Sequence, residues 1–245
     1  MSMPMNNDST KSVTLTFMGK TFTLAQDPSS SNHGLCVWDA SLCFLRYLEA
    51  NPREATAIQG ASVLELGAGT GVLGLALAHC LGARVVLTDL PSVLPNLSSN
   101  LAANPLPPGC EGSLKALEYA WDGSAPPGIL GASPEGQGFH YIIGTDVGYS
   151  ETQNPVLLAS AAALARASAA GGRKATVIFV NELRCELAQA VFDKAAPEHF
   201  KVQRVPSKKL HPDFQRLNFL MTRMTLRKVR APGEGEGEME EAEEA

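Results

Sequence analysis

Several features that would assign this sequence to a class at once are missing. The five cysteines are odd in number and include no Cys-x-x-Cys pair, so neither a disulfide framework nor a zinc ribbon is expected. The five histidines show no ligand spacing, and we predict no metal site. No signal peptide is visible, and the longest small-and-apolar run, residues 156–170, is interrupted by Arg166 and is too short for a membrane span. These absences predict a reduced protein of the cytoplasm, with the nucleus as the alternative compartment, and no membrane partner.

An excess of basic residues is missing too. The 245 residues have a net charge of −5, but residues 231–245 hold seven Glu and no Lys or Arg. Residues 1–230 therefore hold 20 basic and 18 acidic side chains, which excludes a strongly basic nucleic-acid binder of the ordinary kind. We expect the acidic tail and the polar residues 1–12 to be disordered. The rest, residues 13–230, is predicted to be a single domain whose first part, residues 13–60, is an N-terminal extension.

Strand and helix patterns alternate regularly from residue 61 onward. This alternation predicts an α/β fold with a mostly parallel sheet of about seven strands and helices on both faces. A small β-hairpin at residues 13–25 and an amphipathic helix from Trp38 to before Pro52 precede it. Residues 123–138, rich in Gly, Pro and Ser, predict a long surface loop. The predicted strands are Ala61–Leu66, Arg84–Thr88, Leu114–Ala120, His140–Gly144, Ala175–Val180, Phe200–Val205 and Leu217–Met224, and the predicted helices are Val72–Leu81, Ser92–Ala103, Pro155–Ser168 and Arg184–Ala196.

The strongest site signal is the run VLELGAGTG at residues 63–71, where the first predicted strand turns into the first helix. Glycines at such a turn let the backbone bend sharply and approach a ligand closely. Gly69, Gly71 and Gly74 fit the spacing of a dinucleotide site, and Asp89 follows about twenty residues on. The same run also fits a second pattern, in which an acid at the strand end precedes alternating glycines, as in enzymes that use S-adenosylmethionine (SAM).

Charge favours the second interpretation. Glu65 ends the strand before the glycines, where a carboxylate would repel a pyrophosphate but attract the cationic amino-acid end of SAM. Asp89, at the end of the next strand, can accept hydrogen bonds from ribose hydroxyls in either case. A third alternative, in which the glycines only pack the helix on the strand, leaves these acids without a purpose.

A set of residues along the chain resembles one family. The set is Val37-Trp-Asp-Ala40, residues 64–71, Leu87-Thr-Asp-Leu-Pro91, Trp121 and Asp146-x-x-Tyr149. Together they resemble the seven-β-strand (class I) SAM-dependent protein-lysine methyltransferases of the methyltransferase-like 21 type, over about residues 13–225. That family modifies chaperones, AAA ATPases and translation elongation factors. The chain departs from its pattern inside Asp-x-x-Tyr, where Val and Gly replace bulkier apolar residues.

The resemblance implies a Rossmann-like class I methyltransferase fold and SAM contacts at Trp38, Gly67, Ala68, Gly69, Asp89, Trp121 and Thr145. The charge and position of Glu65 add this residue to the predicted cofactor site. Spacing alone leaves Trp38 equally compatible with a core position, because it lies on the apolar face of its helix. Trp121 follows the third strand, where it can border an adenine or simply pack within a surface loop.

Asp146 and Tyr149 follow the fourth strand, at the sheet edge where open α/β sheets bind ligands. We predict that Asp146 accepts hydrogen bonds from an incoming amine and that Tyr149 walls the channel. In the alternative, Asp146 caps the helix that begins near Glu151. Glu182 and Arg184 could also reach a substrate, although a salt bridge is the preferred role for them.

The predicted activity is SAM-dependent methylation of a lysine side chain in a cytosolic protein, by a monomer. The amine must first lose a proton, to solvent or through Asp146, and the sequence does not choose between these routes. One alternative is methylation of a small molecule or of another residue type. An NAD-dependent oxidoreductase, or an interaction protein without activity, would belong to a different class.

Overall fold

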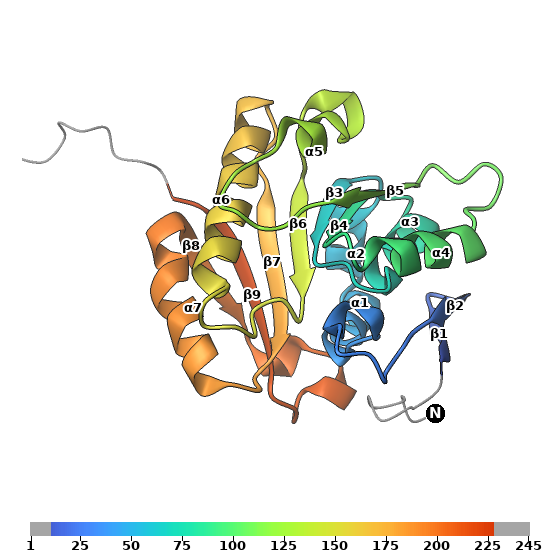
Figure 1. Ribbon diagram of the computed structural model, residues 1–245, viewed down its shortest axis with the longest axis horizontal. Coiled ribbons are helices and arrows are strands. Elements are labelled where there is room, and N and C mark those ends of the chain that lie inside the picture. Colours follow the sequence, from blue (N-terminus) through green and yellow to red (C-terminus); the bar gives the residue numbers. More distant parts are fainter. Residues whose placement is uncertain (1–10, 228–245) are drawn as a thin grey trace, which may run out of the picture.

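The computed structural model describes residues 11–227. Its centre is a seven-stranded sheet in the order β5-β4-β3-β6-β7-β9-β8 (Figure 1). The strands are β3 (Ser62–Leu66), β4 (Arg84–Asp89), β5 (Ser113–Glu118), β6 (Tyr141–Thr145), β7 (Thr176–Glu182), β8 (Phe200–Val205) and β9 (Phe219–Leu226). Neighbours from β5 to β7 pair in parallel, whereas β9 runs antiparallel to β7 and β8. The predicted, mostly parallel sheet of seven strands is confirmed.

Burial along the strands follows from their place in the sheet. Every residue of β3 is buried, and so are all but the first of β6 and all but the two ends of β7. Strands covered on both faces read as near-continuous apolar runs, which is how the sequence presents them. The two edge strands, β5 and β8, are mostly exposed or partly buried, and Phe200 at the start of β8 is their one buried residue.

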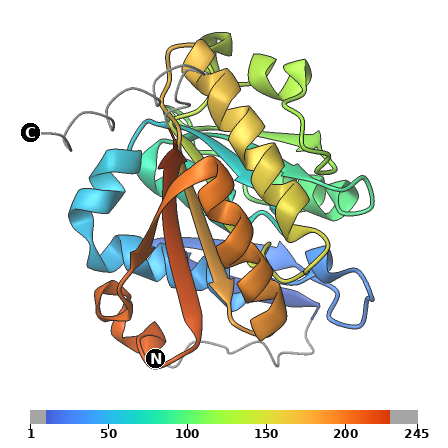
Figure 2. The same ribbon diagram turned by 90° about the vertical axis from the view of Figure 1, so that its left-hand side faces the viewer.

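Helices cover both faces of the sheet, and two apolar clusters lie beneath them. One cluster joins α1, α2 and α3 to side chains such as Val63, Ile143 and Val180, and the other joins α6 and α7 to Leu64, Ile142 and their neighbours. Helices α6 and α7 pack side by side on their face (Figure 2). The bounds are α1 (Asp39–Ala50), α2 (Pro52–Ile58), α3 (Val72–Leu81), α4 (Leu94–Ala103), α5 (Pro127–Gly131), α6 (Asn154–Ala170) and α7 (Glu186–His199).

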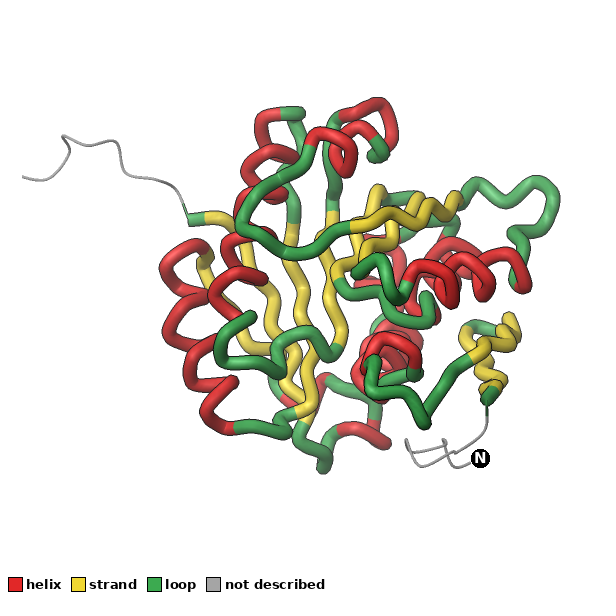
Figure 3. The backbone as a smooth tube through the Cα atoms, viewed as in Figure 1, coloured by secondary structure: helices red, strands yellow, loops and turns green. Residues whose placement is uncertain are grey.

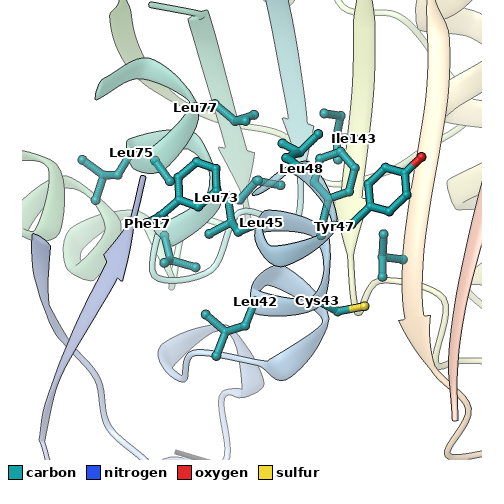
Figure 4. Close-up of a cluster of buried hydrophobic side chains, with 14 of the residues drawn as sticks. Phe17, Leu42, Cys43, Leu45, Tyr47, Leu48, Leu73, Leu75, Leu77 and Ile143 are labelled. Carbon is teal, nitrogen blue, oxygen red and sulfur yellow. The ribbon is translucent and has the colours of Figure 1, made fainter. Parts of the chain in front are cut away.

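The N-terminal extension packs against the first face. Its hairpin, β1 (Ser12–Phe17) with β2 (Lys20–Ala25), lies over α3 and α4. Helix α1 places Leu45 and Leu48 among Leu73, Leu77 and Ile143 (Figure 4). Each fully buried side chain of this size contributes about 1.5–3 kcal/mol of transfer free energy. The extension is therefore held to the sheet by its own apolar residues.

Three local features differ from the predicted elements. The predicted long loop at 123–138 contains the short helix α5 and a 3-10 turn at Pro134–Gly136 (Figure 3). Proline in a first turn fits a helix, because its missing N–H is not needed there. Helix α2 also begins with a proline, where the sequence predicted only a helix end. The last strand starts at Phe219 rather than Leu217.

The predicted disorder of residues 1–10 and of the acidic tail 231–245 lies outside the described residues. Lys11 and Ser12, which the prediction placed in the disordered segment, are described: Ser12 begins β1, and the Lys11 carbonyl accepts a hydrogen bond from the Gln26 N–H. In the described part of the chain, every helix is too short or too polar to cross a lipid bilayer.

Candidate cofactor and amine site

The predicted site residues meet at one edge of the sheet. Five neighbouring parallel strands, β5, β4, β3, β6 and β7, end there. In sheet order, the strand ends and the segments that follow them carry Trp121, Asp89, the loop from Gly67, then Thr145 with Asp146, and finally Glu182 with Arg184. The strand order reverses between β3 and β6, and open α/β sheets bind ligands at such a point.

The loop after β3 is shaped by backbone that approaches its neighbours closely. Gly67 has φ +65°, and a Cβ there would lie 2.7 Å from Val147 Cγ1 and 3.4 Å from Trp121 Cζ2. Gly69 also has positive φ, and a Cβ there would lie 3.2 Å from the Gly34 carbonyl oxygen. The Ala68 N–H between them donates to the Thr88 carbonyl, which ties the loop to β4. Only glycine combines this conformation with these contacts.

Asp89 holds the glycine loop as well as facing the site. Its Oδ2 accepts a hydrogen bond from the Gly69 N–H at 2.7 Å, and its Oδ1 accepts one from the Leu90 N–H at 2.8 Å. Burial raises the pKa of this carboxyl, while the two backbone donors oppose the rise. Each carboxylate oxygen keeps a second lone pair, so Asp89 can still accept from hydroxyl groups.

Glu65 is buried in the structure, whereas the sequence predicted a charged carboxylate that faces the ligand. It is 1% exposed, its Oε2 has no hydrogen-bond partner, and a Cβ on Gly74 would lie 2.8 Å from that atom. Burial raises the pKa of Glu65 to about 8, against the effect of a backbone hydrogen bond from Gly74. The acid is therefore mostly protonated at neutral pH, and the predicted repulsion of a pyrophosphate by its charge does not hold in this structure.

The N-terminal extension completes the site from the other side. Thr145 Oγ1 lies 2.8 Å from Ser41 Oγ in α1, which fixes the start of that helix against the end of β6. Trp38, just before α1, is only partly buried, and its Nε1 donates to the His33 carbonyl. Its ring faces the Arg184 guanidinium at 4.6 Å. The structure thus places Trp38 at the border of the site, rather than deep in the core.

Trp121 lies on the opposite border. It is partly buried, and it packs against the apolar cluster beneath α6 while its ring edge covers Gly67. It therefore packs, as one of the two alternatives required, and its position beside the Gly67 loop leaves the contact with an adenine a prediction.

Asp146 is the most constrained acid of the site. It has φ +59°, a left-handed conformation that is rare outside glycine and is typical of functional positions. Its side chain is 3% exposed, its Oδ1 accepts from the Glu182 N–H at 3.1 Å, and its Oδ2 pairs with Arg184 Nη1 at 2.8 Å. Burial raises the pKa of Asp146, and the Arg184 guanidinium is the largest opposing influence.

The alternative in which Asp146 caps the following helix is wrong. Gln153 precedes α6, and no side chain caps that helix end. The Asp146 carboxylate turns instead toward the end of β7, where a backbone N–H and a guanidinium satisfy it.

Tyr149 stands at the rim, 53% exposed, with its ring 6.4 Å from that of His33 in the N-terminal extension. The two residues before it are packed inside. Val147 fills the space beside Gly67, and the Gly148 N–H donates to Asn181 Oδ1. A Cβ on Gly148 would lie 2.7 Å from Asn181 Nδ2, so a bulkier residue has no room there. Val147 and Gly148, which depart from the family pattern, thus fit the space left by Gly67 and Asn181.

Arg184 and Glu182 lie closer to the site than the sequence indicated. The preferred salt bridge between them does form, but Asp146 is part of it, so the pair belongs to the site. The signal was available, because Glu182 ends β7 and Arg184 follows it, as Asp146 follows β6. Ser41 and His33 carried no sequence signal, since their place depends on how the extension folds back.

The described residues fit a cationic cofactor of the size of SAM. The Gly67 loop has no side chain between its backbone and the site, the Trp38 and Trp121 rings border it, and the Asp89 and Asp146 carboxylates flank it. Among residues 11–227, no group of three or more His, Cys, Asp or Glu side chains could hold a metal ion.

Comparison with known proteins decides the family. The profile of the lysine methyltransferase family matches residues 17–195. The chain belongs to this family. Among curated relatives, it is 32% identical over 168 residues to EEF1A lysine methyltransferase 3 of Mus musculus, which covers 68% of this chain and 64% of the relative. It is 36% identical over 138 residues to the protein N-lysine methyltransferase METTL21A of Mus musculus, covering 56% and 58%. The chain thus matches less than two thirds of the length of these relatives.

Solved structures bear on the fold alone. A methyltransferase from Pyrococcus furiosus superposes with a TM-score of 0.50 at 12% identity, over 77% of this chain and 83% of that chain. SMU.776, assigned as a methyltransferase and solved with S-adenosylhomocysteine, superposes with a TM-score of 0.53 at 12% identity, over 90% and 57%. The predicted Rossmann-like class I methyltransferase fold is confirmed, and so is the predicted family.

Proposed function

We propose that this protein transfers a methyl group from SAM to the side-chain amine of a lysine in a protein substrate. The observation that carries the proposal is the position of Asp146, a buried carboxylate placed directly beside the Gly67 loop by Val147. A carboxylate next to a SAM-type loop can accept hydrogen bonds from an amine and hold it in line with the methyl group. Such alignment is the main demand of a displacement that needs no covalent intermediate.

Family and fold support SAM as the cofactor. The residues that would hold it are Gly67, Ala68 and Gly69 through the loop backbone, and Asp89 and Trp121 at the ribose and base end. Trp38 and Thr145 would border the other end. SAM supplies an electrophilic methyl group whose sulfur leaves as a neutral thioether. The protein's own work is to position the amine and to exclude water.

The substrate is proposed to be a protein, because relatives in the family carry protein-lysine methyltransferase names. An elongation factor, a chaperone and an AAA ATPase are the candidate classes. We place the reaction in the cytoplasm, with the nucleus as the alternative, and we propose a monomeric enzyme. Five free cysteines, Cys43 fully buried among them, suit a reducing compartment.

The test is incubation of the full chain with tritiated SAM and a cell lysate. We expect a labelled protein band, and acid hydrolysis of that band should release methylated lysine. Asp89→Ala is the matched negative control, because it removes a group placed in the cofactor site. Label that appears only in the small-molecule fraction, or on another residue type, would replace the proposal with its nearest alternative.

A further inference from the structure

The head of Arg184 lies inside the site rather than beside it. Its Nη1 is 2.8 Å from Asp146 Oδ2, its Nη2 pairs with Glu182 Oε2, and its Cζ is 4.6 Å from the centre of the Trp38 ring. These three groups come from the end of β6, the end of β7 and the start of α1. Trp38, Asp146 and Glu182 together are called the amine subsite.

The amine subsite has the chemistry that a lysine side chain would meet. A tryptophan face attracts a cation, and two carboxylates accept its hydrogen bonds. One of these carboxylates, Asp146, is almost fully buried, and an ionised carboxylate in such a place requires a cationic partner. In the described structure, Arg184 supplies that partner.

We propose that Arg184 occupies the position of the target lysine, and that the substrate lysine displaces it when the protein substrate binds. This inference rests on the proposed function, and it names the subsite that receives the amine. The exchange replaces one cation by another, so the buried carboxylate of Asp146 is never left without a partner. The subsite thereby selects a cationic side chain at entry.

The place of Arg184 makes displacement inexpensive. Its side chain is 36% exposed, and Cys185, Glu186 and Leu187 after it are also exposed. Because the incoming ammonium takes over the pairing with the buried Asp146 carboxylate, the exchange gives up only the partly exposed pairing of Arg184 with Glu182 and its contact with the Trp38 ring. The guanidinium can therefore turn out into solvent without disturbing β7 or α7.

The sharpest test needs no substrate. In Arg184→Lys, the introduced amine lies where we place the target amine, next to the bound SAM. We expect the variant to methylate itself when it is incubated with SAM alone. The amine nitrogen loses a proton to solvent, its lone pair bonds to the methyl carbon, and the carbon–sulfur bond breaks with its electrons on sulfur. Mass spectrometry of the peptide that contains position 184 detects the added methyl group.

Arg204→Lys is the matched control. Arg204 is 35% exposed, pairs with Asp193 and lies 6.0 Å from the Phe192 ring, but it belongs to β8, two strands away from β7. We expect no methylation at position 204 or in the wild-type chain. An Arg184→Lys variant that binds SAM with wild-type affinity and keeps the wild-type melting temperature, yet stays unmodified, would overturn the proposal.

A second test measures binding, not activity. The chain has two tryptophans, so Trp121→Phe leaves Trp38 as the fluorescent reporter. Titration with n-butylammonium, which mimics a lysine side chain, should show about three- to tenfold tighter binding in Arg184→Gln than with Arg184 in place, because the resident cation no longer competes. Arg204→Gln should bind it as the parent does. Equal affinity for n-butylammonium in Arg184→Gln and in the parent that keeps Arg184 would also contradict the proposal.

The two tests separate this inference from the proposed function. A labelled protein band in the lysate assay, together with an unmodified Arg184→Lys variant, leaves the lysine methyltransferase activity standing and removes only the role of Arg184. Self-methylation of Arg184→Lys without any labelled lysine in the lysate would support the subsite and direct the search to another amine substrate.

Discussion

At the scale of single residues, Asp89 joins the cofactor site to the loop that forms it. Asp89→Ala removes the acceptor of the Gly69 N–H and the acceptor proposed for the ribose. We expect the affinity for SAM to fall by about 1.5–3 kcal/mol, the scale of hydrogen bonds to a charged group, while the sheet remains folded. Calorimetry of SAM binding measures the loss. A folded variant with wild-type affinity would remove Asp89 from the cofactor site.

Asp146 is expected to act on turnover and not on cofactor binding. Asp146→Asn keeps the size of the side chain and an oxygen for the Glu182 N–H, but it loses the charge and presents donor hydrogens to Arg184 or to an incoming amine. A misplaced amine can cost on the order of 10²-fold in rate. Single-turnover methylation beside a SAM titration measures both effects. Full activity of Asp146→Asn would contradict the proposed role of Asp146. Loss of SAM binding in this variant would show that Asp146 belongs to the cofactor site.

Glu65 predicts a pH dependence of stability. Burial raises its pKa from 4.5 to about 8, so the folded protein retains a proton that the unfolded chain has already released between these values. Stability from this group is therefore present at low pH and is lost as the pH rises toward 8. The side chain of Glu65→Gln cannot ionise. The melting temperature of this variant minus that of the wild type should therefore increase between about pH 5 and pH 8.5. Asp89 and Asp146 are present in both proteins, and parallel curves would refute the buried, protonated acid.

At the scale of elements, the turn from β3 into α3 decides whether a ligand can approach. Gly67→Ala introduces strain at φ +65° and places a Cβ 2.7 Å from Val147. Gly60→Ala is its matched control, because φ is +66° there and nothing lies within 4 Å of the added atom. Both should lose about 1–2 kcal/mol from left-handed strain, and Gly67→Ala about 1–3 kcal/mol more from overpacking.

The same pair of variants reports on binding. Because Gly67 borders the site and Gly60 does not, SAM affinity should fall in Gly67→Ala and stay at the wild-type level in Gly60→Ala. Thermal unfolding and calorimetry on the two proteins test both statements. If Gly67→Ala and Gly60→Ala had the same stability and the same SAM affinity, the loop would have adjusted to the added methyl group, and Gly67 would not shape the site.

At the scale of the whole molecule, the proposed cofactor choice can be checked by stability alone. A ligand that binds only the folded state stabilises it by about 2.7 kcal/mol at a concentration of 100 times its dissociation constant. SAM and its demethylated product should therefore raise the melting temperature, whereas NAD should leave it unchanged. A shift with NAD and none with SAM would favour the dinucleotide interpretation of Gly69, Gly71 and Gly74.

The sequence by itself determined the order of the elements and the edge where the site lies. Apolar runs such as residues 62–66 leave a strand no alternative to burial on both faces, and positive-φ positions such as Gly67 admit few residues besides glycine. These constraints act between neighbours in the chain, and that is why the sequence pattern alone assigns Asp89 and Asp146 to one edge of the sheet, where the family resemblance adds Thr145.

Only the tertiary structure decided which groups face one another at that edge. The charge of Glu65 looked decisive in the sequence, but burial beneath α3 raises its pKa to about 8, and burial depends on the packing of the whole face. The pairing of Asp146 with Arg184 and the stacking of Arg184 on Trp38 join segments that lie far apart in the chain. Contacts between such distant segments follow from how strands order in the sheet and how the N-terminal extension folds back, which no local pattern encodes.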